Sequence, residues 1–208
     1  MYRYAENGSL GQTLKAFGKL DERLVASYVI KILNGLDYIH RNGVVHCGLK
    51  ADSIITTRDG GVKLSEFGTS FRLREIEQTR PVIAGSPNWT APEVIELSGI
   101  STKCDIWSLG CTVIELLTGR PPYADITNIV TGAGPFCIHF TKFNPYLMLS
   151  VMFRIVEDDC PPIPRSFGDL LVAFLKECFH KDPGQRPSAE ELLKHEWFKQ
   201  YLRLDKVR

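Results

Sequence analysis

The chain has 208 residues, 44% of them hydrophobic and 24% charged, which is ordinary for a globular protein and long enough for one domain with a substantial core. Its net charge of +1 argues against a basic nucleic-acid-binding surface and against attraction to an acidic membrane. The charges scattered over the first 30 residues exclude a signal-peptide core, no apolar run reaches about 18 residues, and the six cysteines form no C-x-x-C pair. We therefore expect a reduced, cytoplasmic protein without a nucleic-acid or membrane partner.

The first 42 residues predict two helices. The residues Ser9-Leu-Gly-Gln12 resemble a capping box, and they open a short helix that ends near Gly18. A longer helix is expected from about Glu22 to Asn42. Its apolar residues recur with a helical period at Val25, Tyr28, Val29, Ile32, Leu33, Leu36 and Ile39.

The next segment predicts a small hairpin and then a long loop. Residues 53–57 and 61–64 are β-like, and they flank the turn signal Arg58-Asp59-Gly60. Residues 65–93 are polar and contain Gly and Pro, so a loop is expected. A loop of this length in a compact domain is usually functional or disordered.

The C-terminal half predicts a set of helices. Residues Thr102–Thr118 are apolar nearly all round, which is typical of a helix buried on every side. Gly119 and the prolines after it end this helix. Further helices are expected at about 147–157, 168–180 and 188–199. The fold class is therefore mainly α with a small β hairpin.

Five motifs point to one family. Residues 46–53, His-Cys-Gly-Leu-Lys-Ala-Asp-Ser, resemble the protein-kinase catalytic loop, His-x-Asp-Leu-Lys-x-x-Asn. Residues 65–68 resemble the Asp-Phe-Gly motif, and residues 85–93 resemble the end of the activation segment. Residues 105–110 resemble the start of the buried central helix, and residues 182–188 resemble the segment before the last helix. The chain is thus similar to Ser/Thr protein kinases of the MAP kinase kinase kinase branch, with fungal septation-initiation and plant epsilon-type kinases as the nearest likeness.

The resemblance implies a single protein-kinase-like domain over residues 1–208, corresponding to the C-terminal lobe of the fold. Residues 1–5 resemble the hinge between the lobes, so we expect the N-terminal lobe to be absent. ATP and Mg²⁺ are the cofactors of the family. The backbone groups of Arg3 and Ala5 would contact adenine in an intact relative, and Ile55 would floor the pocket. Because half of that pocket belongs to the other lobe, we expect this chain to bind nucleotide poorly.

Three substitutions in the catalytic motifs predict loss of phosphotransfer. Gly48 stands where the family has the aspartate that accepts the substrate hydroxyl proton, and removing a general base typically costs about 10²–10⁴ in rate. Ser53 replaces the asparagine that holds a magnesium ion. Glu66 replaces the magnesium-binding aspartate with a longer arm, or is a solvated loop acid. Lys50, which contacts the transferred phosphate in relatives, is either still a phosphate contact or a relic.

The residues that brace the family's fold are all present. The resemblance implies that Glu93 pairs with Arg186 beneath the activation segment, and that Asp105 holds the catalytic-loop backbone near His46. Removing one member of a buried pair costs about 3–5 kcal/mol. Cys47 stands where many relatives have an arginine that receives a phosphorylated loop, and cysteine cannot pair with phosphate. The sequence therefore indicates that the residues that stabilise the fold are retained although the catalytic residues are replaced.

Residues 126–150 are expected to be an insertion, because relatives have a much shorter stretch here. Residues 126–153 carry one charged side chain, Lys142. The insertion is either a docking loop or translated non-coding sequence from a mis-spliced gene. Three interpretations of the whole chain stay open. The first is an inactive pseudokinase that binds a protein through the groove near Ser86–Trp89 and the helices at 147–199. The others are a weak ATP-dependent Ser/Thr phosphotransferase and a non-functional fragment.

Overall fold

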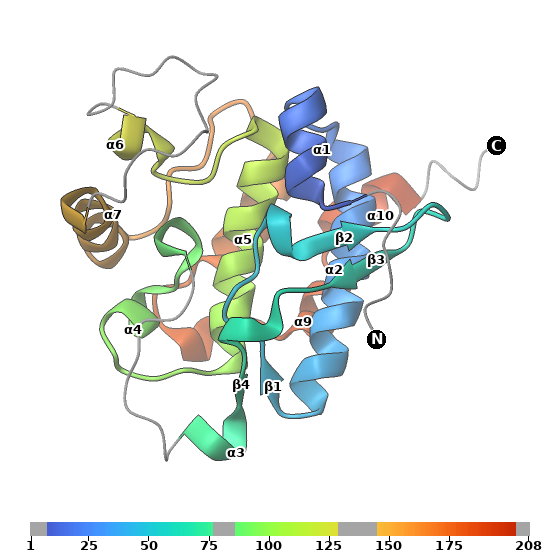
Figure 1. The fold of residues 1–208 in the computed structure, drawn as a ribbon. Coiled ribbons are helices and arrows are strands. Elements are labelled where there is room, and N and C mark those ends of the chain that lie inside the picture. The colour runs from blue at the N-terminus through green and yellow to red at the C-terminus, as the bar shows by residue number, and fades with distance from the viewer. Residues whose placement is uncertain (1–7, 77–85, 129–144, 203–208) are drawn as a thin grey trace.

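The computed structural model describes residues 8–76, 86–128 and 145–202, and its centre is a buried helix, α5 (Thr102–Thr118). Every residue of α5 from Cys104 to Ile114 is buried, as the apolar pattern predicts. Ser101 caps its N-terminus, and Gly119 ends it with a φ of 79°, a left-handed conformation that suits glycine. In Figure 1, α1 and α2 lie on one side of α5, and α6 and α7 lie on the other.

The two predicted N-terminal helices are present as α1 (Leu10–Phe17) and α2 (Glu22–Arg41). The capping box of α1 is formed, because Ser9 and Gln12 each accept a hydrogen bond from the other's backbone N–H. Asp21 caps α2. Most of the predicted apolar stripe of α2 is fully buried, whereas Tyr28 and Ile39 are partly buried against the core.

The predicted hairpin is confirmed and a second strand pair joins it. Strands β2 (Ile54–Thr56) and β3 (Val62–Leu64) are antiparallel, with Ile55 opposite Lys63. The additional pair is β1 (Val44–Val45) with β4 (Phe71–Arg72). The fold class, mainly α with a small β component, is confirmed.

The segment predicted as one long loop contains several short elements. Besides β4, they are 3₁₀ turns at Phe67–Thr69 and Pro87–Trp89 and the helices α3 (Leu73–Ile76) and α4 (Pro92–Ile95). Each has four residues or fewer, so none carries enough periodicity to be detected in the sequence. Strand β4 exists because β1, far away in the sequence, pairs with it.

Five helices follow α5 in the described part of the chain, and among them α8 packs on α5. They are α6 (Ala124–Asn128), α7 (Pro145–Glu157), α8 (Asp169–Cys178), α9 (Ala189–Leu192) and α10 (Glu196–Leu202). The end of α8 approaches α5 closely at Gly110, where an added Cβ would lie 2.7 Å from the Phe179 ring.

The last predicted helix is divided into α9 and α10. The side chain of His195 caps the start of α10, because its Nδ1 accepts a hydrogen bond from the backbone N–H of Trp197 at 3.0 Å. The capping box of Ser188 and Glu191 opens α9 as expected. The predicted insertion at 126–150 falls largely outside the described residues. Its last part, from Pro145, forms the first turns of α7, and the insertion itself stays a prediction.

Candidate active site

The loop that follows β1 is held by one buried carboxylate. Asp105, in the first turn of α5, accepts hydrogen bonds from the backbone N–H of His46 at 2.8 Å and of Cys47 at 2.9 Å. Its Oδ2 also lies 2.8 Å from Nε2 of His40. Asp105 is fully buried and has donors on both oxygens, so it is satisfied as a charged group must be in a protein interior. The structure thus brings together His46 and Asp105.

The ring of His46 connects this loop to residues 65–68. Its Nε2 lies 2.8 Å from the carbonyl oxygen of Ser65, and its Nδ1 accepts from the backbone N–H of Gly48 at 3.2 Å. These partners require a neutral ring with the proton on Nε2. The ring also packs on Phe67, with 4.8 Å between the centroids. The two motifs therefore form one rigid unit.

The position expected for the catalytic base holds no acid, and its space is occupied. A Cβ built on Gly48 would lie 2.5 Å from Oγ1 of Thr69, closer than real Cβ contacts come. That hydroxyl lies 3.4 Å from the carbonyl oxygen of His46. A hydroxyl does not accept a proton at neutral pH as a carboxylate does. The sequence identifies Thr69 only as one of several hydroxyls in the activation-like segment, and nothing in its spacing places it beside Gly48.

The residues at the expected magnesium-ligand positions do not fit the ion. Ser53 is fully buried, and its hydroxyl donates to the carbonyl oxygen of Lys50 at 2.9 Å and accepts from the Lys50 N–H at 3.0 Å. Those bonds close the 3₁₀ turn Ala51–Ser53. Glu66 is half-exposed in a left-handed conformation, φ 59°, and its carboxylate lies 3.8 Å from Nζ of Lys50. The Ser53 hydroxyl is already hydrogen-bonded and the Glu66 carboxylate is already ion-paired, so these two groups are poorly suited to the octahedral oxygen coordination that Mg²⁺ requires.

Lys50 lies at a very small cavity between the loop and the 3₁₀ turn Pro87–Trp89. Its Nζ is 3.4 Å from the hydroxyl of Ser86. The cavity has a volume of about 10 Å³, which suits about one water molecule. Its lining is Cys47, Gly48, Leu49, Lys50, Ser86, Trp89, Thr90 and Ser108.

The residues expected to meet adenine are placed only in part. Arg3 and Ala5 lie outside the described residues. Ile55 is half-buried in β2, where it faces Lys63 on one side and forms an isolated antiparallel bridge with Ser9 on the other. Its role in a nucleotide pocket stays a prediction.

A residue that sequence reasoning missed connects the two segments. Glu115 of α5 accepts, on one carboxylate oxygen, the backbone N–H of Ala51 and the indole N–H of Trp89, both at 3.0 Å. Burial raises the pKa of Glu115 to about 7. A signal existed, since Glu115 is the one charged residue between Ile106 and Thr118.

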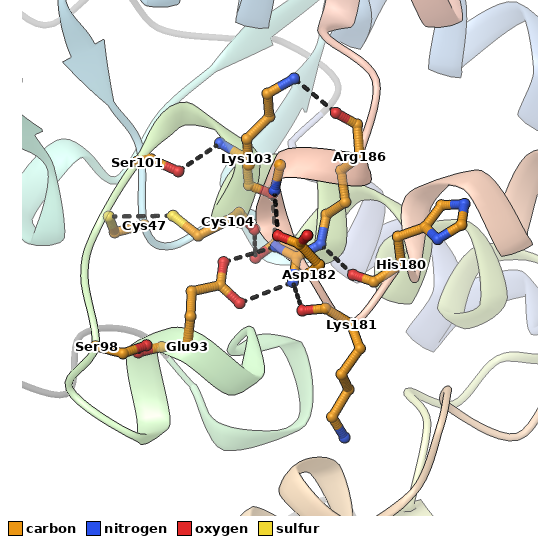
Figure 2. A network of polar contacts seen from close by, with 12 residues as sticks. Cys47, Glu93, Ser98, Ser101, Lys103, Cys104, His180, Lys181, Asp182 and Arg186 are labelled. Carbon is orange, nitrogen blue, oxygen red and sulfur yellow. Dashed lines mark hydrogen bonds and ion pairs between the residues drawn. The ribbon is translucent and has the colours of Figure 1, made fainter.

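Glu93 and Arg186 form a buried, two-pronged ion pair, shown in Figure 2. The guanidinium donates to the two carboxylate oxygens at 2.6 and 2.7 Å. It also donates to the carbonyl oxygens of His180 at 2.7 Å and Lys103 at 3.0 Å, and it lies over the Trp107 ring at 5.0 Å. This pair joins α4, next to the end of the activation-like segment, to the turn before α9.

Comparison with known proteins places the chain in a family. The model of the family described as "Protein kinase domain" matches residues 1–198. Among curated proteins, "Cytokinesis protein sepH" of Aspergillus niger is 44% identical over 204 residues, which are 98% of this chain and 14% of that protein. "MAP3K epsilon protein kinase 1" of Arabidopsis thaliana is 44% identical over 198 residues, 94% of this chain and 13% of that protein.

"Cell division control protein 7" of Schizosaccharomyces pombe is also 44% identical, over 194 residues, which are 93% of this chain and 16% of that protein. The chain therefore spans about one seventh of the length of the relatives it matches. The likeness expected from the motifs, to Ser/Thr kinases of the MAP kinase kinase kinase branch, is confirmed. Among the described residues, no helix is long and apolar enough to cross a membrane.

Proposed function

Because the chain belongs to the protein kinase family, we propose that it is a Ser/Thr kinase-like domain that no longer transfers phosphate and instead binds another protein in the cytoplasm. The family uses ATP and Mg²⁺. We further propose that the described helices correspond to the C-terminal lobe of the kinase fold. The observation that carries the proposal is the site around Gly48.

The missing base supports inactivity because, among the residues that the structure describes, neither of the two side chains nearest to Gly48 can replace it. The side chain nearest to the vacant position is the hydroxyl of Thr69, 2.5 Å from where a Cβ would be. The ring of His46 is next, but its Nδ1 already accepts the N–H of Gly48 and its Nε2 faces Ser65. A general base must reach the proton it removes at about 2.6–3.2 Å and must be basic enough to hold it. The Thr69 hydroxyl is not basic at neutral pH, and both ring nitrogens of His46 are engaged.

The altered ligand positions support the same conclusion independently. In the family, positioning and charge neutralisation by metal ions supply most of the rate enhancement. The Ser53 hydroxyl is bonded to the backbone of Lys50, and the Glu66 carboxylate lies beside the Lys50 ammonium. We therefore derive no catalytic step through a metal ion for this chain.

A binding role is supported by one face of α7. Tyr146, Leu149 and Phe153 are 79%, 50% and 65% exposed, and their spacing places them on one side of the helix. The opposite side buries Val151 and Ile155. Large exposed apolar side chains that gather in one place are typical of protein–protein contact sites. The partner that fits is a protein presenting apolar side chains.

A phosphate-transfer assay tests the inactive half of the proposal. With Mg²⁺ or Mn²⁺ and a generic Ser/Thr substrate, the chain should transfer no labelled γ-phosphate above background, while the kinase domain of an active relative does. Turnover that disappears on the substitution Lys50→Ala would overturn the proposal in favour of a weak Ser/Thr phosphotransferase.

A comparison of two exposed aromatic residues tests the binding half. The assay is capture of a binding protein on the immobilised chain. The variant Phe153→Lys on α7 should no longer retain the protein that the wild type binds, because central aromatic contacts often contribute more than about 2 kcal/mol to binding. Phe17→Lys on α1 is the matched control, since Phe17 is also largely exposed but lies on another element. Equal capture by both variants would contradict a docking role for α7.

A further inference from the structure

The geometry points to a modification site: we propose that Cys47 and Cys104 form a reversible disulfide when the protein meets a hydroperoxide. The two sulfur atoms are 3.8 Å apart, although the residues are 57 positions apart in the chain. Figure 2 shows the two thiols facing each other next to the Glu93–Arg186 pair. Both are buried, with 7% and 3% of their surface exposed.

The backbones that carry the two thiols are fixed, so the sulfur atoms stay close. Asp105 follows Cys104 directly in α5, and its carboxylate accepts the backbone N–H of Cys47 at 2.9 Å. The N–H of Cys104 donates to the carbonyl oxygen of Ser101 at 3.1 Å. A disulfide has a sulfur–sulfur distance of about 2.0 Å, so the pair must close by about 1.8 Å. Rotation of the two side chains supplies a movement of this size without unfolding either segment.

A small cavity reaches one of the two cysteines. Cys47 lines the cavity of about 10 Å³ beside Gly48 and Lys50, whereas Cys104 does not. A cavity of this size suits about one water molecule, and hydrogen peroxide is little larger than water. Cys47 is therefore the thiol that reacts first.

The reaction balances with the peroxide as the only co-reactant. The Cys47 sulfur attacks one peroxide oxygen and gives up its proton, the O–O bond breaks, and the hydroxide that leaves takes that proton as water, so that Cys47 becomes a sulfenic acid. The Cys104 sulfur then attacks the sulfenic sulfur, the S–S bond forms, and the hydroxide that leaves takes the proton of Cys104 as a second water. Two thiols lose two electrons in total, and one peroxide gains them.

The same residues are a poor metal site, which leaves the two-thiol chemistry. The ligand atoms of Cys47, Cys104 and Asp105 lie within 4.8 Å of one another. The Asp105 oxygens, however, already face His40 and the N–H groups of His46 and Cys47. A hydrogen bond with Cys47 and burial raise the pKa of Cys104 well above its usual range, so Cys104 stays a thiol until its neighbour is oxidised.

The test is oxidation of the whole reduced chain with hydrogen peroxide, followed by tryptic mapping without reductant. A disulfide should link peptide 42–50, which contains Cys47, to the peptide that begins at Cys104, with loss of two hydrogens and reversal by dithiothreitol. That second peptide also contains Cys111 and, because the bond between Arg120 and Pro121 resists trypsin, Cys137. The variants Cys104→Ser, Cys111→Ser and Cys137→Ser therefore assign the bridge: the first should abolish it and the other two should keep it.

Cys160 is the matched control for exposure, because it is the one half-exposed cysteine among the described residues. If exposure alone governed reactivity, oxidation would begin at Cys160 and the Cys47–Cys104 link would not form. That result, a link retained in Cys104→Ser, or oxidation of Cys47 only to sulfinic or sulfonic acid would each overturn the proposal. The wild-type map decides the matter even if a variant fails to fold, and it does not depend on phosphotransfer activity.

Discussion

Breaking the buried Glu93–Arg186 pair should destabilise the domain far more than removing any exposed ion pair. In the variant Glu93→Ala, the Arg186 guanidinium keeps the carbonyl oxygens of His180 and Lys103 but loses both carboxylate bonds. The cation is then buried without a counter-charge, which typically costs about 3–5 kcal/mol. For a domain of this length, 1 kcal/mol corresponds to about 2–4 °C, so the thermal midpoint should fall by about 6–20 °C.

The assay is thermal unfolding followed by circular dichroism, with two controls. Lys194→Ala removes an exposed pair with Glu190 and should change stability by less than about 1 kcal/mol. The double variant Glu93→Leu, Arg186→Met removes both charges and should recover part of the loss, because the unpaired cation is gone. If Glu93→Ala were as stable as Lys194→Ala, the desolvation argument would be refuted.

Two further predictions concern the site. The folded protein holds the Glu115 proton more tightly than the unfolded chain, because the pKa of Glu115 is about 7 when folded and 4.5 when unfolded. Protonated Glu115 therefore stabilises the folded state fully below about pH 4.5. This contribution, at most roughly 3 kcal/mol, is lost as the pH rises through 7. Urea unfolding at pH 5 and pH 8 should show a smaller loss for Glu115→Gln than for the wild type, and equal losses would contradict the pKa assignment. Gly48→Asp should cost about 1–3 kcal/mol, because its Cβ meets the Thr69 hydroxyl, and adding Thr69→Ala should relieve it. If the thermal midpoint of Gly48→Asp did not change when Thr69→Ala was added, the loop would be shown to adjust without strain.

The elements that could be predicted from the sequence are those whose signals are local. The capping residues Ser9 and Ser188 marked helix starts correctly, because a cap involves only three or four neighbouring residues. The α5 helix was detectable from its apolar composition on every side. In contrast, β4 has two residues and pairs only with β1, and α10 begins at a histidine cap that the sequence did not reveal.

The candidate site was predictable where a motif fixes both residue and partner. The motifs led to Asp105 with the His46 backbone, and to Glu93 with Arg186, and the structure places each pair in contact. No motif could show that Thr69 occupies the space beside Gly48, or that Lys50 holds both the turn around Ser53 and the Glu66 carboxylate. Those contacts depend on side-chain conformations in three dimensions, which residue spacing does not specify.

The way Asp105 holds the loop separates the shape of the loop from its side chains. The carboxylate accepts hydrogen bonds from the backbone N–H groups of His46 and Cys47. Every residue except proline has such an N–H group. Substitution of the side chains of His46 and Cys47, other than by proline, therefore leaves these two hydrogen bonds available as long as the aspartate in α5 remains. This arrangement explains how a reactive acid can be exchanged for glycine while the surrounding scaffold persists. It also makes the loop a suitable place for new side chains, because the residue that anchors its backbone, Asp105, lies in α5 and not in the loop.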